Sequence, residues 1–566
     1  MTSLPASASA GLFAGTPRFS DSALAAVAAR AGCAAAWREA YARHGRRAPE
    51  HADGGFAIGF TAEDGSIFLA VDRFAIRSLC YRVADGTLHF AERADALAGD
   101  GASACAIDPQ AIFDYLFCHT IPSPRTVFQG VHRLPPGHYA LFRDGALTVA
   151  PWWEPRFEET RRADFARLRD EFRQRLADAV ATQIEGHDPA RLGCFLSGGT
   201  DSSTVAGMLG QVSGQPAATY SIGFDAEGYD EMEFARIAAR HFRTRHHEYY
   251  VTPDDLVRSI AEVAAHYDQP FGNSSALPAY YCARVARADG VERMLAGDGG
   301  DELFGGNSRY AKQRVFGWYQ HLPAPLRSGL LEPLLALPGS GRLPLLRKAS
   351  SYVEQARVPL PDRMHMYNLL LRLGVREVLC DDFLAGIDPD APARQQREVW
   401  AQARAASAIN RVLAFDWRYT LAENDLPKVR GTTQLAGVEV GFPMLDARLV
   451  DFSLGLPPEY KLKGLRLRWF FKEALRGFLP DAIIGKKKQG FGLPFGVWTT
   501  RHAGLRRLAE DSLHSLAGRG IVRPEFIRVL LAERLPEHPG YYGEMVWILM
   551  MLEQWLQAHR PAYGMR

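Results

Sequence analysis

The sequence has few cysteines and none of the long apolar segments that mark a membrane or secreted protein. Its 566 residues include seven scattered cysteines without a Cys-x-x-Cys pair, so neither a disulfide framework nor a zinc site is indicated. The longest apolar run near the C-terminus, residues 545–552, is far too short to cross a bilayer. The first residues lack the charged and apolar segments of a secretory signal. We therefore expect a cytoplasmic protein with reduced thiols and no membrane partner.

An excess of charge of either sign is also missing. Lysine and arginine number 66 against 64 aspartates and glutamates, which gives a net charge of +2, and the longest basic run is residues 486–488. This balance gives no field that would favour nucleic acid as a partner. An apolar content of 47% and a charged content of 23% are ordinary for a globular protein. A chain of this length is too long for one core.

The N-terminal part carries repeated hairpin signals. Pairs of short apolar segments flank turns rich in aspartate and glycine at residues 55–60 with 66–71, 81–83 with 88–90, and 139–142 with 147–149. Consecutive antiparallel hairpins predict a layered, β-rich domain. We place this domain at residues 1–155.

After residue 155 the pattern changes to alternating strands and helices. Apolar residues between 165 and 180 recur at helical spacing, and three strand candidates follow at 192–196, 219–224 and 247–251, separated by helical segments at 203–211 and 231–242. This alternation predicts an α/β domain with a doubly wound parallel sheet, whose ligands bind at the carboxyl ends of the strands. We place it at residues 156–566, with helical additions that include residues 320–410.

The first motif with chemical content lies directly after the strand candidate 192–196. Residues 197–203 read Ser-Gly-Gly-Thr-Asp-Ser-Ser and lead into a helix. A strand, a glycine-rich turn and a helix together direct backbone N–H groups at one point, where phosphate oxygens fit. Asp201 would repel phosphate unless a cation lay between them, which favours a magnesium–nucleotide complex. No Gly-Lys-Ser/Thr follows, so this is not the P-loop; the alternative is a simple turn between a core strand and a core helix.

A second acidic turn occurs at residues 297–306, Gly-Asp-Gly-Gly-Asp-Glu-Leu-Phe-Gly-Gly. Its three carboxylates repel one another unless a metal ion or solvent screens them. On a functional interpretation Asp301 is a second magnesium ligand facing Asp201, and Asp298 lies nearer the reacting carboxyl group. The alternative is an acidic helix start that needs no ligand.

The third motif is basic. Residues 485–494 read Gly-Lys-Lys-Lys-Gln-Gly-Phe-Gly-Leu-Pro. Lysines beside glycine can reach phosphate oxygens or a developing oxyanion. The alternative is a solvated basic loop, which would show the same sequence pattern.

Taken together, these segments resemble the asparagine synthetase family, class B-like. Members join an Ntn-type glutaminase domain to a synthetase domain of the ATP pyrophosphatase type. The resemblance runs from about Phe56 to Trp555 and is strongest at residues 196–203, 221–231, 297–306, 423–446 and 486–494.

The resemblance implies the ligands ATP and Mg²⁺ and a set of site residues. Asp201 and Asp301 would hold the metal ion, Asp298 would assist attack by ammonia or an amine, and Lys488 or Lys487 would stabilise charge as pyrophosphate leaves. The nucleotide would lie against Leu196, Ser197, Gly198, Gly199, Asp201, Ser202, Ser203, Ser221, Ile222, Gly223 and Gly297. The implied reaction activates a carboxylate as an acyl-adenylate, which the nitrogen nucleophile then attacks.

The N-terminal part departs from the family pattern. Glutamine-using members begin Met-Cys, whereas this chain begins Met1-Thr2-Ser3 and its first cysteine is Cys33. The family's glutamine-binding segments are also missing. We expect a degenerate domain without glutaminase activity. Thr2 as an N-terminal nucleophile is the alternative, although a threonine hydroxyl needs an adjacent base and none is evident.

The synthetase part departs as well. A family carboxylate is replaced by Arg430, and two family arginines are replaced by Gly431 and Gly441. Glycine cannot clamp a carboxylate as arginine does, so we expect an altered charge pattern around the acceptor pocket. Alternatively, these residues formed an internal ion pair that was lost together.

These departures leave several functions open. The partners would be a small-molecule or peptide carboxylate and ammonia or an amine. The amine could lie on the same molecule, as in the related β-lactam synthetases and lasso-peptide cyclases. A non-catalytic regulator and an enzyme that modifies a macromolecule are rival interpretations. The oligomeric state, a homodimer included, is left open.

Two further clusters carry weaker signals. His241, His246 and His247 alternate with arginines that would repel a metal ion, so we interpret them as surface or ribose-adjacent residues. Glu423, Asp425 and Lys428 fall on an expected helix, where they either support the site or form helix-face ion pairs.

Overall fold

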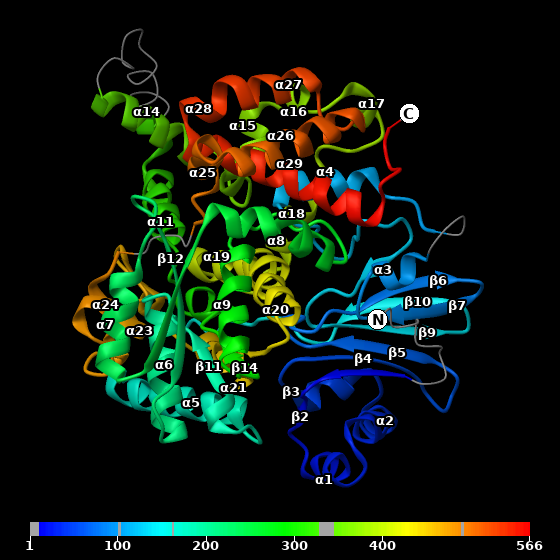
Figure 1. The fold of residues 1–566 in the computed structure, drawn as a ribbon. Coiled ribbons are helices and arrows are strands. Elements are labelled where there is room, and N and C mark those ends of the chain that lie inside the picture. Colours follow the sequence, from blue (N-terminus) through cyan, green and yellow to red (C-terminus); the bar gives the residue numbers. More distant parts are fainter. Residues whose placement is uncertain (1–10, 100–103, 161–163, 328–343, 488–491, 566) are drawn as a thin grey trace.

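The computed structural model describes residues 11–99, 104–160, 164–327, 344–487 and 492–565. A β-rich N-terminal part lies beside a larger α/β part, and the C-terminal helices cover one end of both (Figure 1). Within the described residues, no helix combines the length and apolar character that crossing a membrane requires.

The N-terminal part contains two antiparallel sheets. One has the strand order β1 (Leu12–Gly15), β4 (Phe56–Thr61), β5 (Ile67–Val71), β9 (His138–Arg143) and β10 (Ala146–Pro151), and the other has the order β7 (Thr87–Ala91), β6 (Cys80–Ala84) and β8 (His132–Arg133). All three predicted hairpins are confirmed. Two of them turn at Asp85-Gly86 and Asp144-Gly145, where all four residues have positive φ. Such two-residue turns match the twist of antiparallel strands.

Three layers result from this arrangement. The helices α1 (Ser22–Ala31) and α2 (Cys33–His44) pack Leu24 and Trp37 against one face of the larger sheet. The opposite face packs against the smaller sheet through residues such as Leu69, Leu88 and Phe90. The predicted layered β-rich domain is therefore present, with two helices that the hairpin pattern did not reveal.

The α/β part is built on a parallel sheet, as predicted, and this sheet has five strands. Its order is β13 (Arg245–Val251), β12 (Ala218–Phe224), β11 (Leu192–Phe195), β14 (Arg293–Leu295) and β15 (Glu439–Gly441). Of these, β11, β12 and β13 match the three strand candidates. The order reverses between β11 and β14, and the clefts that follow such a reversal are the usual ligand sites of doubly wound sheets. The strand β15 lies 144 residues after β14 (439 − 295), and the sequence pattern did not predict it.

Helices cover both faces of this sheet. On one face lie α5 (Phe165–Ile184), α6 (Thr200–Ser213) and α7 (Met232–Phe242). In α5, Leu168, Phe172 and Leu176 are buried at helical spacing, which confirms the amphipathic helix. On the other face lie α9 (Ala276–Ala288) and α20 (Leu426–Leu435).

The segment between β14 and β15 is mainly helical, as expected for residues 320–410. It includes α10 (Gly300–Phe304), α11 (Ser308–His321), α14 (Pro344–Arg357), α18 (Ala391–Gln402) and α19 (Ala408–Asp416). A π-helical segment, η7 (Trp417–Asp425), joins α19 to α20. Such segments are frequent at functional sites because they shift the side chains around the helix axis.

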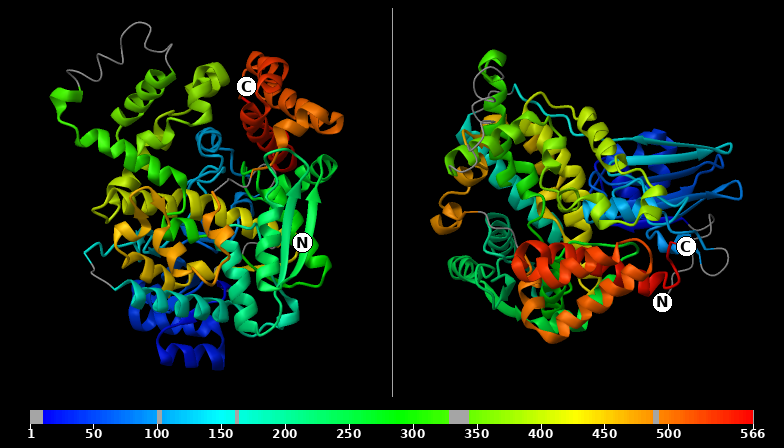
Figure 2. Two further views of the ribbon diagram at one scale, coloured as in Figure 1. Left: turned by 90° about the vertical axis from the view of Figure 1, so that its left-hand side faces the viewer. Right: turned by 90° about the horizontal axis from the view of Figure 1, so that it is seen from above.

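The largest core contains residues from both parts of the chain. The helix α4 (Pro109–Cys118) lies beside α29 (Pro539–His559) (Figures 1 and 2), and the buried hydroxyl of Tyr115 donates a hydrogen bond of 2.8 Å to the carbonyl of Ile548. The same core includes α8 (Pro253–His266), α25 (Phe495–Arg501) and α26 (Ala503–Gly518). The two parts of the chain are thus joined by a common hydrophobic core.

Candidate functional site

Two loops meet at the carboxyl ends of β11 and β14, where the strand order reverses. They carry the first two sequence motifs and form one wall of a cleft of about 1130 Å³. A Cβ atom at Gly297 would lie 2.9 Å from the carbonyl carbon of Asp201, so only glycine allows the two loops to approach so closely. The chain thus folds the two acidic turns into one site.

The loop after β11 is held by its own serines. The N–H of Ser197 donates to Oγ of Ser202 at 3.1 Å, and the N–H of Gly199 donates to Oγ of Ser197 at 3.4 Å. Gly198 has a φ of 68°, and a Cβ atom there would lie 2.4 Å from the backbone nitrogen of Ala235. The helix α6 begins after Gly199 without a side-chain cap, which leaves its first N–H groups available to an anion.

The structure brings Asp201 and Asp301 together around one arginine. Nη1 of Arg468 donates to Oδ2 of Asp201 at 2.6 Å and to Oδ1 of Asp301 at 2.9 Å, and Nη2 donates to Asp201 as well. Arg468 has a left-handed backbone with a φ of 54° and stacks its guanidinium 4.1 Å from the ring centre of Phe471. The two carboxylates therefore share the single positive charge of this arginine in this conformation.

The two carboxylates fit a magnesium ion chemically. Cβ atoms at Gly300 and Gly306 would lie 2.0 Å from Oδ1 of Asp201 and 1.7 Å from Oδ1 of Asp301, so these glycines make the space that the carboxylates occupy. Carboxylate oxygens combined with substrate phosphates are the usual ligands of Mg²⁺. Because Arg468 uses the same oxygens, a metal ion and this arginine cannot both bind them fully.

Asp298 belongs to a second charged group on the cleft wall. Nζ of Lys428 lies 2.8 Å from Oδ1 of Asp425 and 3.8 Å from Oδ1 of Asp298. Burial raises the pKa of Asp298 to about 6, although Lys428 opposes the shift. Burial lowers the pKa of Lys428, but Asp425 and Asp298 outweigh it and raise that pKa above its usual range. The helix-face ion pair considered from sequence is present and faces the cleft.

Most of the predicted site residues line the cleft: Leu196, Ser197, Gly199, Asp201, Ser202, Ser221, Ile222, Gly297, Asp298, Asp301 and Lys487. Gly198, Ser203 and Gly223 lie next to the cleft and do not line it. Ser203 is fully buried, and a Cβ atom at Gly223 would lie 2.6 Å from the ring of Tyr250. Lys488 lies outside the described residues.

Several residues of the cleft were missed from sequence. Arg468 stands in no recognisable motif, and Thr200, Lys472 and Glu302 also line the cleft. Burial, followed by the nearby Asp425, raises the pKa of Glu302 to about 8. Lys486 was part of the basic motif but was not singled out; its Nζ lies 3.2 Å from Oε1 of Glu231 and 3.5 Å from the carbonyl oxygen of Gly198.

The histidine cluster does not form a metal site. His247 lies 2.9 Å from Asp289, His246 lies 3.0 Å from the hydroxyl of Thr219, and His241 bonds a backbone carbonyl. Across the described part of the chain, no group of three histidine, cysteine, aspartate or glutamate side chains could hold a metal ion.

The altered family positions do not line this cleft. A Cβ atom at Gly441 would lie 2.5 Å from Oε1 of Gln183 and 3.2 Å from Nη2 of Arg293, and one at Gly431 would lie 2.6 Å from the ring of Tyr267. Arg430 and Gly431 instead line a separate cavity at the junction of the two parts of the chain. Arg430 and Gly431 therefore change the charge of that cavity, and none of the three altered positions lines the cleft.

Comparison with known proteins gives matches over most of the chain. The model of the asparagine synthase family matches residues 171–557, and that of the glutamine amidotransferase domain matches residues 37–153. Asparagine synthetase [glutamine-hydrolyzing] 1 of Bacillus subtilis is 25% identical over 87% of this chain and 75% of its own length. Asparagine synthetase [glutamine-hydrolyzing] 3 of the same organism is 23% identical over 90% and 80%.

A relative with a different name is similar to the same extent. Amidase chyE of Penicillium rubens is 25% identical over 81% of this chain and 72% of its own length. The family model covers more than half of the residues, and the cleft carries both acidic turns of the family pattern. The chain belongs to the asparagine synthase family and is an ATP-dependent ligase.

Proposed function

We propose that this enzyme forms an amide bond by activating a carboxylate with ATP. The acceptor carboxylate attacks the α-phosphorus of ATP, which gives an acyl-adenylate and pyrophosphate. An amine or ammonia then attacks the acyl carbon, loses a proton and releases AMP. The single observation that carries this proposal is the convergence of residues 197–203 and 297–306 on one cleft at the reversal point of the sheet.

In this proposal, the loop after β11 and the first turn of α6 bind the phosphates through backbone N–H groups. Asp201 and Asp301 would hold Mg²⁺, which would neutralise phosphate charge when bound. Lys487 lines the cleft, and Lys486 reaches the carbonyl oxygen of Gly198. Lysines at this position would stabilise the departing pyrophosphate.

Asp298 is proposed to accept the proton that the attacking nitrogen loses. A pKa of about 6 leaves this carboxyl mostly ionised at neutral pH and still close enough to neutrality to exchange a proton. The ammonium of Lys428 at 3.8 Å would hold the carboxylate in the cleft and keep it ionised.

We further propose that the nitrogen arrives as ammonia or an amine and is not released from glutamine by this chain. Glutamine hydrolysis of this type needs a thiolate. Burial raises the thiol pKa of Cys80, Cys118, Cys194, Cys282 and Cys380, which makes a thiolate at these positions unfavourable. Released glutamate would be measured with purified enzyme and glutamine; its appearance at the rate of amide formation would contradict this part of the proposal.

Pyrophosphate exchange into ATP tests the central proposal. The assay would be run with aspartate, with other amino acids and with carboxylates that carry an internal amine. Exchange that depends on one carboxylate and disappears in Asp301→Asn is expected, while the exposed variant Asp382→Asn should retain it. Exchange with aspartate would favour asparagine formation, and exchange only with an amine-bearing carboxylate would favour an intramolecular cyclase. Unchanged exchange in Asp301→Asn would overturn the metal assignment.

A further inference from the structure

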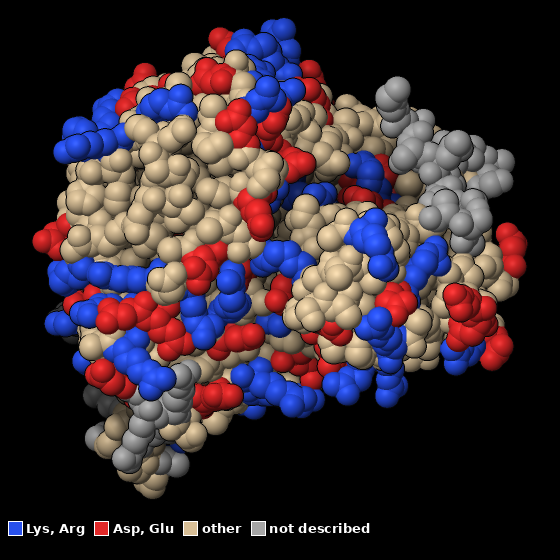
Figure 3. Space-filling model, turned by 90° about the horizontal axis from the view of Figure 1, so that it is seen from below, with Lys and Arg blue, Asp and Glu red and all other residues tan. Residues whose placement is uncertain are grey.

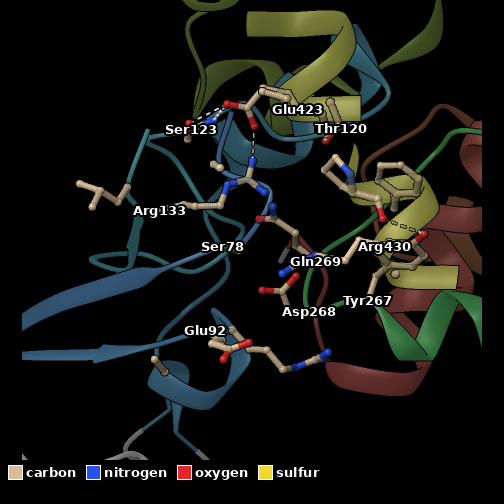
Figure 4. Close-up of a pocket in the computed structure, with 18 of the residues that line it drawn as sticks. Ser78, Glu92, Thr120, Ser123, Arg133, Tyr267, Asp268, Gln269, Glu423 and Arg430 are labelled. Atoms are coloured by element: carbon tan, nitrogen blue, oxygen red, sulfur yellow. Dashed lines mark hydrogen bonds and ion pairs between the residues drawn. The ribbon is translucent and has the colours of Figure 1, made fainter. Parts of the chain in front are cut away.

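A second cavity lies at the junction of the two parts of the chain, separate from the nucleotide cleft. Its volume is about 420 Å³, within the range of roughly 300–1,000 Å³ that is usual for small-molecule sites. Glu92 and Arg133 enter it from the N-terminal part, Asp268 and Gln269 from the segment after α8, and Arg430 from α20 (Figure 4).

One side of this cavity is a network of hydrogen bonds and ion pairs centred on Glu423. The carboxylate of Glu423 accepts hydrogen bonds from Arg133 and from Arg418, each at 2.5 Å, and from the hydroxyl of Ser123 at 2.6 Å. Thr120 donates to the carbonyl of Glu423 at 3.1 Å. These groups bond to one another and to backbone carbonyls, and so they shape this side of the cavity.

Arg93 also lines the cavity and pairs with Asp95 at 2.6 Å, whereas Arg430, Glu92 and Asp268 form no ion pair among the described residues. Among the described residues, the guanidinium of Arg430 has no hydrogen bond and no carboxylate within 4.0 Å, and Glu92 has no cation within that distance. Asp268 accepts the N–H of Ala94 at 2.8 Å, its single hydrogen bond among the described residues. Besides the paired Arg93 and Arg133, the cavity therefore holds Arg430 and two carboxylates, Glu92 and Asp268, which act on Arg430 electrostatically without a direct ion pair.

Gln269 adds an unsatisfied acceptor. The residue is only 6% exposed, and its buried Oε1 has no hydrogen-bond partner within the described chain. A buried polar atom without a partner is costly in a folded protein and calls for an explanation; Arg430, Asp268 and Glu92 beside it are partly exposed. A ligand that supplies N–H donors beside Asp268 and Gln269 and an anionic group beside Arg430 would satisfy all of them.

We propose that this cavity binds a small zwitterion of the α-amino acid type. Its carboxylate would pair with Arg430, and its ammonium would donate to Asp268, Glu92 and Oε1 of Gln269. A phosphate or dicarboxylate without an amine fits less well, because Asp268 and Glu92 would repel it. A bare cation fits less well, because Arg430 lines the same space.

Binding of a ligand in this cavity would influence the nucleotide cleft, because the two sites share a helix. Both sites share α20: Lys428 and Val429 line the cleft, while Arg430 and Gly431 line the cavity. Tyr267, which also lines the cavity, donates a hydrogen bond of 3.2 Å to the carbonyl of Lys428. The inference does not depend on the acceptor or on the reaction proposed above.

Calorimetric titration of the full chain without nucleotide tests the site. The probes are the common L-amino acids at millimolar concentration, and for any binder its N-acetyl derivative and its α-amide, which lack one of the two charges. We expect one or more amino acids to bind and both derivatives to bind at least about tenfold more weakly, since each loses a charged hydrogen bond. No binding by any amino acid, or equal binding by the derivatives, would overturn the proposal.

Variants then locate the site. Arg430→Met and Asp268→Asn should weaken binding by about tenfold or more, and Arg430→Lys should weaken it less. Asp301→Asn should leave it unchanged, although this variant is expected to lose pyrophosphate exchange. If Arg430→Met fails to fold, Arg430→Lys and Asp268→Asn decide the matter. Binding that survives both cavity substitutions but is lost in Asp301→Asn would assign the amino acid to the nucleotide cleft and refute the second site.

Discussion

Arg468 is the residue on which the acidic pair depends. It is buried and donates to Asp201, Asp301 and Thr200. Its removal would leave two carboxylates facing each other without a counter-charge. We expect Arg468→Met to reduce the free energy of unfolding by about 3–5 kcal/mol, as for other broken buried ion pairs.

Urea unfolding without nucleotide or metal measures this effect. The exposed neighbour Arg466 provides the control, and Arg466→Met should change stability little. Asp301→Asn in the Arg468→Met background should recover part of the loss, because it removes the repulsion. An additive double variant would show that the arginine does not act through these carboxylates.

Lys461 is a buried lysine whose titration should be visible in stability. Its Nζ donates to Asn410 at 2.9 Å, and burial lowers its pKa from 10.5 to about 7. Between these two pH values the unfolded chain binds a proton that the folded chain does not, so stability should rise with pH across this window, by at most about 1.4 kcal/mol per pH unit.

Urea unfolding would measure the free energy of unfolding of the unmodified protein and of Lys461→Met between pH 7 and pH 10. The free energy of unfolding of the unmodified protein should rise relative to that of the variant as the pH increases. Parallel profiles for the two proteins would mean that Lys461 keeps an ordinary pKa in the folded state.

At the scale of the element, α20 and the π-helical segment before it line both the cleft and the separate cavity at the junction of the two parts. Lys428 on α20 lowers the pKa of Asp298, which burial raises to about 6. We expect the rate of amide formation to fall as Asp298 becomes protonated below this pH. In Lys428→Met the acid limb of the rate profile should move to higher pH, because the opposing charge is gone.

This prediction is checked by the dependence of kcat/KM on pH for both proteins. An acid limb that stays in place, with only a lower plateau, would show that Lys428 binds substrate and does not tune Asp298. Folding of the variant would be verified by its thermal transition at neutral pH.

Much of the fold was predictable at this scale. The hairpins turned on Asp-Gly pairs, and three of the five parallel strands, β11, β12 and β13, matched short strand candidates between helical segments, because both signals are local in the sequence. The acidic turns were predictable for the same reason. Arg468, the strand β15 and the pairing of Glu423 were not, since each depends on contacts between segments that lie more than 100 residues apart.

At the scale of the whole molecule, charge is mixed and no single-sign field is evident. On the face drawn in Figure 3, lysine and arginine alternate with aspartate and glutamate, in line with the net charge of +2. The common hydrophobic core and specific buried pairs, and not a general field, therefore connect the two parts of the chain.

The Glu423 network is one such buried pair, in which Arg133 and Ser123 of the N-terminal part bond to Glu423. Glu423 is 2% exposed. Burial raises the pKa of its carboxyl, but Arg133 and Arg418 outweigh burial and hold it below its usual range. Glu423→Gln should cost about 3–5 kcal/mol, whereas Glu439→Gln, which breaks the half-exposed pair with Arg293, should cost far less.

Scanning calorimetry at neutral pH measures both variants. Because the stabilisation requires an ionised Glu423, it should be present above pH 4.5 and disappear as the pH falls through the lower folded-state pKa. Equal losses of stability in the two variants would mean that the position of Glu423 between the two parts of the chain adds no stability.

The hydrophobic core that joins α4 to α29 has a consequence for how this chain can change over time. A chain that started at residue 156 would present the flank of its C-terminal helices to water, since Tyr115 and its neighbours pack there. Whatever chemistry the first 155 residues keep or lose, we expect their removal to destabilise the remaining part of the chain, because it would expose this core. Substitutions in that segment can persist where its packing against the C-terminal helices is kept. Its deletion would cost the remaining part of the chain some of its stability.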